Sequence, residues 1–159
     1  QDLGMQLGAV KKATNTKVIN VVSQSFGLKA YVGDQERIVN LIVKNDQVPA
    51  SATQSFGTRE ENQTSVELLI AENGSSDRYY DIDKSREIGN AEISGLPNGL
   101  PEGSPIEVTF KLNEQGILDI YARELSSGRD AKVTIQTEGG ISQEEFEEAR
   151  ERSKGLVIS

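Results

Sequence analysis

The sequence predicts a mostly β protein, an antiparallel β-sandwich of about eight strands followed by a short C-terminal α-helix. Short β-branched runs are separated by turn residues roughly every 8 to 12 positions between Val18 and Thr137, as is typical of antiparallel sandwiches. In 105–112 and 117–123 the apolar residues alternate, as expected when one face of a strand packs on a core. Strands are expected at residues 18–24, 26–32, 36–44, 53–58, 64–72, 87–94, 105–112, 117–123 and 130–137.

Turn residues separate these runs and favour antiparallel connections. They are Asn73 with Gly74, Asn98 with Gly99, and Gln115 with Gly116. Asn-Gly pairs adopt positive φ readily, which suits tight reversals. Residues 75–84 are expected to form a long loop.

The pattern changes after the glycine pair at 139–140. Ser142 and Glu145 match a capping box, and the charged residues that follow favour a helix over 142–154. We expect residues 1–17 to be a flexible lead-in from a preceding domain and linker, and 18–138 to be the sandwich. Residues 139–159 would then hold the helix and tail.

Composition excludes several classes of function. The chain has no cysteine and no histidine, which removes thiolate ligands and the commonest general base. With 17 basic and 25 acidic residues, its formal charge is −8, which repels phosphate backbones and argues against nucleic acid as a partner. No run approaches the roughly 18 apolar residues of a membrane span, and no secretory signal is visible. We therefore expect a cytoplasmic protein with no membrane partner and, in this part, no cofactor.

The residues offer little for catalysis and more for peptide binding. Carboxylate clusters, at Glu60 and Glu61 or at Asp77, Asp81 and Asp83, could in principle bind calcium or act as acid and base. The spacing of Asp77, Asp81 and Asp83 lacks the glycine and terminal glutamate of an EF-hand loop, so a solvated acidic loop explains it better. A peptide groove needs a rigid β scaffold with apolar side chains at loop ends. The candidates are Leu28, Tyr31, Phe56, Val66, Leu68 and Ile106. Spacing alone favours a simpler interpretation, in which all six belong to the core.

Several motifs in order carry a more specific indication. Residues 56–67 read Phe-Gly-Thr-Arg-Glu-Glu-Asn-Gln-Thr-Ser-Val-Glu, followed by Ile-Glu-Val-Thr-Phe at 106–110 and Asn-Glu-Gln-Gly-Ile-Leu at 113–118. Upstream stand Ser-Phe-Gly-Leu at 25–28 and Lys-Asn-Asp-Gln-Val-Pro at 44–49. Together they resemble the substrate-binding domain of the 70-kDa heat-shock (DnaK-type) chaperones, and the chain looks like a divergent paralogue.

The resemblance implies an eight-stranded β-sandwich that holds an extended, leucine-rich peptide, and the first helix of a truncated helical lid. By position, the pocket-lining side chains fall on Leu28, Phe56, Val66, Leu68 and Ile106, with Val66 at the base. Backbone groups along the peptide fall on Ala30, Gly57 and Glu67. The pair that arches over the peptide falls on Tyr31 and Arg59, a ring and a cation that can stack.

The resemblance also implies partners. They are unfolded polypeptides, a nucleotide-binding domain of the same chain that binds and hydrolyses ATP, and a J-domain co-chaperone. This part would not itself be an enzyme. The tail residues Leu156, Val157 and Ile158 could occupy a neighbour's groove and cause self-association.

Some positions depart from the family pattern. In the family the linker consists of leucines and ends in aspartate, whereas this chain has Val18, Ile19 and Asn20 there. An acidic residue commonly precedes the Gly-Ile-Leu turn in the family, and Gln115 replaces it here. Because these acids help dock the nucleotide-binding domain in the family, the ATP coupling of this protein is expected to differ. The segment 74–85 is longer than usual and could make contacts of its own.

Two alternatives to peptide capture follow from the same residues. One is a structural or interaction sandwich whose six pocket positions are buried in one another. The other is a carbohydrate-binding or hydrolytic sandwich, which predicts exposed aromatics or paired carboxylates around a cleft. A groove lined by Leu28, Phe56 and Val66 would favour peptide binding over both.

Overall fold

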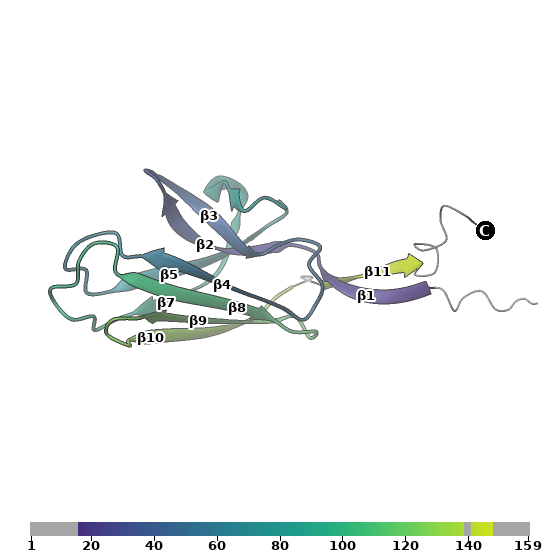
Figure 1. The fold of residues 1–159 in the computed structure, drawn as a ribbon. Helices are drawn as coiled ribbons and strands as arrows, with labels where there is room; N and C mark the ends of the chain where they lie inside the picture. Colours follow the sequence, from purple (N-terminus) through teal and green to yellow (C-terminus); the bar gives the residue numbers. More distant parts are fainter. Residues whose placement is uncertain (1–15, 139–140, 148–159) are drawn as a thin grey trace, which may run out of the picture. The chain divides into compact units, whose positions relative to one another are not determined.

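The computed structural model describes residues 16–138 and 141–147, which form strands and one short 3-10 helix (Figure 1). The strands are β1 (Thr16–Val22), β2 (Ser25–Val32), β3 (Gln35–Ile42), β4 (Ala50–Gly57), β5 (Val66–Asn73), β6 (Tyr79–Tyr80), β7 (Arg86–Ile93), β8 (Pro105–Leu112), β9 (Ile117–Glu124), β10 (Asp130–Gln136) and β11 (Ile141–Glu147). The 3-10 helix η2 spans Ile82–Lys84. The protein is therefore mostly β, as the sequence predicts.

The chain divides into two compact units. The larger unit, residues 21–142, contains a four-stranded sheet in the order β10-β9-β8-β4 and a five-stranded sheet in the order β6-β3-β2-β5-β7. All the strand pairs in these sheets are antiparallel. The described residues of the other unit, 16–20 and 143–147, lie in the two-stranded sheet of β1 and β11.

The core of the larger unit lies between the two sheets. In β8 the alternate residues Ile106, Val108, Phe110 and Leu112 are buried, and in β9 so are Leu118, Ile120 and Ala122. They pack with buried residues of the five-stranded sheet, among them Phe26, Leu28, Val39, Ile70 and Ile93. The alternation seen in the sequence is thus confirmed as the inward face of the four-stranded sheet.

The two sheets approach closely along one side of the sandwich. There β7 of one sheet lies against β10 of the other. A Cβ atom placed on Gly89 of β7 would lie 2.6 Å from Cδ1 of Ile135 on β10. The absence of a side chain at Gly89 therefore lets the Ile135 side chain pack directly on the backbone of β7, and a larger residue would require the Ile135 side chain to shift.

The C-terminal helix expected over 142–154 is not confirmed. Its first residues, through Glu147, belong to β11, which pairs with β1; the remainder, including the tail at 156–158, lies outside the described residues. Five of the seven residues of β1 are β-branched, which favours a strand. Pairing with this strand satisfies the backbone of β11 and outweighs the local capping signal, as tertiary context often does.

The segment 75–84 was expected to be a loop and is more ordered than that. Tyr79 and Tyr80 form β6, which pairs with β3, and the 3-10 helix follows. Of the expected turn glycines, Gly99 and Gly116 have positive φ, of 91° and 79°.

Candidate functional site

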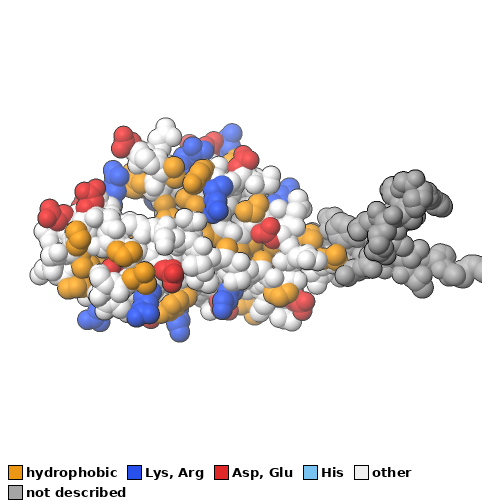
Figure 2. Space-filling model, viewed as in Figure 1, with side chains coloured by type: hydrophobic (Ala, Val, Ile, Leu, Met, Phe, Trp, Pro, Cys, Tyr) orange, Lys and Arg blue, Asp and Glu red, His pale blue; other side chains and the backbone are white. Residues whose placement is uncertain are grey.

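One end of the larger unit contains a groove of about 480 Å³. It lies between the β2–β3 hairpin, β4 and the start of β5, and Figure 2 shows hydrophobic side chains gathered beneath this hairpin. Its lining includes all the site residues expected from the sequence, namely Leu28, Ala30, Tyr31, Phe56, Gly57, Arg59, Val66, Glu67, Leu68 and Ile106. The lining also includes Lys29, Val32, Glu36, Val39, Gln54, Ser55, Gln63, Tyr79 and Val108. Residues that are far apart in the sequence therefore meet at one site.

The groove opens where two neighbouring strands separate. β2 pairs with β5 only over Ser25–Leu28, and the ladder ends at the pair Leu28 and Ile70. Beyond it, β2 continues to Val32 in contact with β3, while β5 begins at Val66 in contact with β7. The facing edges of 29–32 and 66–69 therefore lack a strand between them. An extended segment could supply the missing backbone partners there.

The floor of the groove is apolar and tightly packed. Leu28 and Leu68 are each 3% exposed and Ile106 is 2% exposed. Phe56 and Val66 stand higher and are partly buried. Phe56, opposite Ile106 in the β4–β8 ladder, belongs to the four-stranded sheet, and Val66 on β5 belongs to the five-stranded sheet, so one wall comes from each sheet. A ligand side chain between the walls would contact Phe56 and Val66 first.

The rim of the groove carries most of the exposed large hydrophobic side chains. Among the described residues these are Tyr31, Val32, Tyr79 and Leu125, and the first three line the groove. Isolated exposed hydrophobics are ordinary, but a cluster beside a cavity marks an interaction surface.

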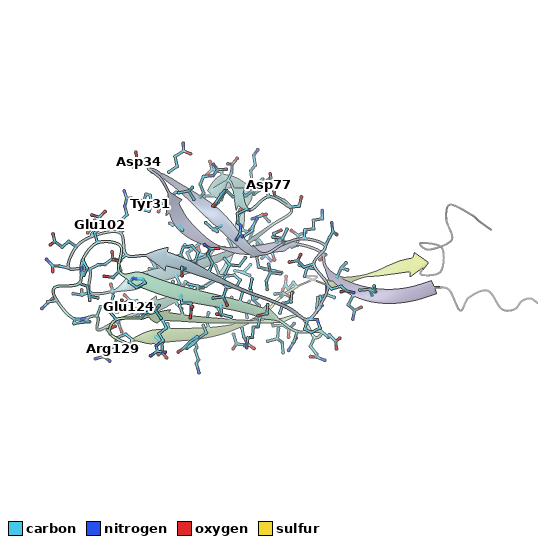
Figure 3. All side chains as sticks on the ribbon, viewed as in Figure 1. Tyr31, Asp34, Asp77, Glu102, Glu124 and Arg129 are labelled. Atoms are coloured by element: carbon cyan, nitrogen blue, oxygen red, sulfur yellow. The ribbon has the colours of Figure 1, made fainter. Side chains whose placement is uncertain are left out.

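A cation and an aromatic ring bridge the two walls. The guanidinium carbon of Arg59, in the β4–β5 loop, lies 3.6 Å from the ring centroid of Tyr31 on β2. The stack between these two residues, anticipated from the sequence, is therefore present; Figure 3 shows Tyr31 on the side of the hairpin that faces β4. Nearby, Lys29 Nζ and Glu36 Oε2 are 3.7 Å apart. Such exposed pairs contribute little stability but orient their side chains.

The polar residues of the 56–67 motif hold the loop that carries Arg59. The side-chain oxygen of Gln63 accepts hydrogen bonds from the backbone N–H groups of Arg59 (2.9 Å) and Glu60 (3.1 Å). Thr58 Oγ1 donates to the carbonyl of Pro101 and accepts from the N–H of Ser104. The motif thus fixes the loop against residues 101–104 and presents Arg59 to the groove.

A buried carboxylate lies on the strand next to Ile106 of the groove floor. Glu124, 0% exposed, pairs with Ile106 in the β8–β9 ladder. Its side chain accepts hydrogen bonds from the N–H and Oγ of Ser126 and from the N–H of Ser127, at 3.2, 2.6 and 2.7 Å. Burial would raise the pKa of the Glu124 carboxyl, but these bonds outweigh it and lower the pKa below its ordinary value. Glu124 therefore fixes the β9–β10 turn as an anion; Figure 3 labels it.

Replacing Glu124 by glutamine is expected to lower the free energy of unfolding at pH 7 by about 1–3 kcal/mol. Because the folded pKa is lowered, the native chain has this stabilisation in full above about pH 4.5, the ordinary pKa. It loses the stabilisation as the pH falls through the lower folded value. Urea unfolding of both proteins at pH 7 and pH 3 would measure this. Glu107→Gln, on the exposed face of β8, is the control; a native–Glu124→Gln difference that does not shrink at low pH contradicts the assignment.

Sequence reasoning did not single out Glu124 or Tyr79. Glu124 follows Leu118, Ile120 and Ala122 in the alternating series of residues that face the core. A charged residue at such a core-facing position could have identified it from the sequence. Tyr79 gave no comparable signal, because its place depends on a pairing with β3 across 40 residues of sequence, as in the pair Val39 and Tyr79.

The described residues show neither a metal-ligand cluster nor a transmembrane helix. In residues 16–138 and 141–147, no three acidic side chains lie together as a metal site would require. None of the helical structure described there is long and apolar enough to cross a bilayer.

Comparison with known proteins relates the chain to a protein family and to a named relative. A model of the Hsp70 protein family matches residues 4–156 of the 159. The chain is also 29% identical, over 146 residues, to a protein named chaperone protein dnaK from Thalassiosira pseudonana. That alignment covers 91% of this chain but 23% of the relative, so the chain spans about a quarter of that protein's length.

Proposed function

The chain belongs to the Hsp70 family, and from this premise we propose that its larger unit is a chaperone module for unfolded polypeptides. The groove binds an extended segment and takes one apolar side chain, such as leucine, between Phe56 and Val66. The backbone of the bound segment pairs with the separated edges of β2 and β5. This part of the protein binds its ligand without changing it chemically.

The observation that carries the proposal is the apolar groove at the gap between β2 and β5. Buried Leu28 and Leu68 form its floor, while Tyr31 and Val32 remain exposed on its rim. Backbone hydrogen bonds do not depend on the side chains of the bound segment, and the pocket requires only that one of those side chains be apolar. These are the properties required to recognise many unfolded chains.

The energies suit reversible binding. Burying one leucine side chain contributes roughly 1.5 to 3 kcal/mol, and each backbone hydrogen bond adds about 0.5–1.5 kcal/mol. The formal charge of −8 favours segments with basic residues near the apolar one. Affinity is therefore expected in the micromolar range.

The two alternatives make different demands on the same residues. A sandwich that has lost peptide capture requires the pocket residues to cover one another; Leu28, Leu68 and Ile106 are covered, but Tyr31 is 46% exposed. For a carbohydrate-binding or hydrolytic site, the groove lining offers two exposed tyrosines, Tyr31 and Tyr79. Its carboxylates would be Glu36 on β3 and Glu67 on β5, with β2 between them. The apolar floor favours peptide over both.

Val66→Phe is expected to weaken peptide binding at least tenfold. Val66 is only partly buried, so a larger side chain would extend into the groove instead of overpacking the core. The measurement is fluorescence anisotropy of a labelled leucine-rich peptide with basic flanks. The native chain should saturate at micromolar concentration.

Leu125→Phe is the matched control, since Leu125 is 45% exposed and lies outside the groove lining. It should bind peptide like the native chain. Native binding that is absent, or that Val66→Phe leaves unchanged, would reject the proposal.

Regulation belongs to the same proposal. In the full-length protein a separate nucleotide-binding domain would bind and hydrolyse ATP and control the groove, and a J-domain partner would deliver clients. The neutral Asn20 and Gln115 stand where the family's docking acids are expected, so this coupling would be weaker than usual.

A further inference from the structure

The segment between β5 and β7 forms a third side of the groove. A pair of buried amides holds it in place. Asn40 and Asn73, 0% and 4% exposed, donate hydrogen bonds to each other's side-chain oxygens at 3.3 and 3.1 Å. Asn40 also donates through its side chain to the carbonyl of Asp77 and through its backbone to that of Arg78, at 2.8 and 2.7 Å. Asp77 is visible beside the β2–β3 hairpin in Figure 3.

These bonds place Tyr79 on the groove side of the sheet. Tyr79 pairs with Val39, and Val39 pairs with Leu28. Residues directly opposite one another share a face, so Leu28, Val39 and Tyr79 form one row. Along this row the exposed fraction rises from 3% and 5% to 49%. The row runs from the buried floor to an uncovered aromatic ring.

The same segment reaches the other sheet. Arg78 Nη1 donates to Gln54 Oε1 on β4 at 3.1 Å, and Gln54 lines the groove. Tyr79 is therefore held at the rim next to a bond that joins the two walls. Tyr80, one residue further, pairs with Ile38 and is directed to the opposite face.

We propose that Tyr79 is a specificity-determining residue: its ring forms a second apolar subsite that takes an aromatic or aliphatic ligand side chain. This inference rests on the proposed function. Leu28 and Tyr79 are two strand spacings apart, roughly 10 Å, measured across the strands and not along them. Val66 and Tyr79 line the same groove, so the second side chain is expected from a residue close to the central leucine, within about three positions, that points beneath the β2–β3 hairpin.

The test uses peptides with a central leucine, basic ends and serine elsewhere, in which phenylalanine replaces serine at one position at a time. For the native chain, phenylalanine at one or two positions within three of the leucine should tighten binding about fivefold. Tyr79→Thr, which keeps a residue suited to a strand, should reduce this gain to less than twofold. Tyr79→Phe should retain it.

Tyr80→Thr is the matched control, because it changes the same strand at a residue that does not line the groove. A gain that survives in Tyr79→Thr, or that is lost equally in Tyr80→Thr, would overturn the inference while peptide binding itself remains. If the native chain binds none of the peptides, the proposed function fails, and this inference fails with it.

Discussion

Substitution of Gly27 by alanine is expected to lower the free energy of unfolding by about 3 kcal/mol. A Cβ atom at this position would lie 2.5 Å from the carbonyl oxygen of Val39, 2.7 Å from Oδ1 of Asn40 and 2.7 Å from Cγ2 of Ile38. Two of these neighbours cannot yield easily: one is backbone, and the Asn40 amide is held by Asn73 and by the Asp77 carbonyl. β2 would have to move away from β3.

Urea unfolding would measure the loss, and peptide binding should weaken too, because the next residue, Leu28, is part of the groove floor. Gly74→Ala is the control: its Cβ would meet only Gln24 Oε1, at 3.9 Å, and its effect should stay within about 0.5 kcal/mol. Equal effects of the two substitutions would show that the close approach at Gly27 does not constrain the fold.

Phe110→Ala is expected to destabilise the protein by about 3–5 kcal/mol. Phe110 is 0% exposed and lies between Ala52 on β4 and Ile120 on β9. Truncating it removes a large apolar side chain and leaves a cavity between the sheets. The closely packed side chains around the cavity cannot fill it without rearranging.

Chemical denaturation of the Phe110 variant would measure this effect. Lys111→Ala changes the next residue, on the exposed face of the same strand, and should alter stability by no more than about 0.5 kcal/mol. A Phe110→Ala loss below about 1 kcal/mol would mean that the core collapses around the missing ring.

The sequence predicted the parts of the fold that depend on local pattern. Period-two alternation in 105–112 and 117–123 sufficed to find β8 and β9 and their inward faces, because the strand repeat is strict. The groove residues are different. Spacing assigned Phe56 and Val66 to the core, and only the resemblance brought them to one site.

What the sequence did not predict depends on pairing between distant segments. The run after Ser142 has helical signals of its own, and its strand exists because 16–22 pairs with it. Likewise, residues 79–80 are too short to show any period, and β3 supplies the partner that makes them a strand. Local propensities carry no information about such partners.

The positions of the sheet edges have a consequence for aggregation. Unpaired edge strands invite pairing with other chains, and proteins usually cover or interrupt them. In the larger unit, β7 and β10 shield one another at Gly89 and Ile135. The other edges of the two sheets are β4 and β6, and both contribute residues to the groove. A segment bound in the groove would therefore lie beside both of these remaining edges and would leave less room for a second copy of the chain to approach them.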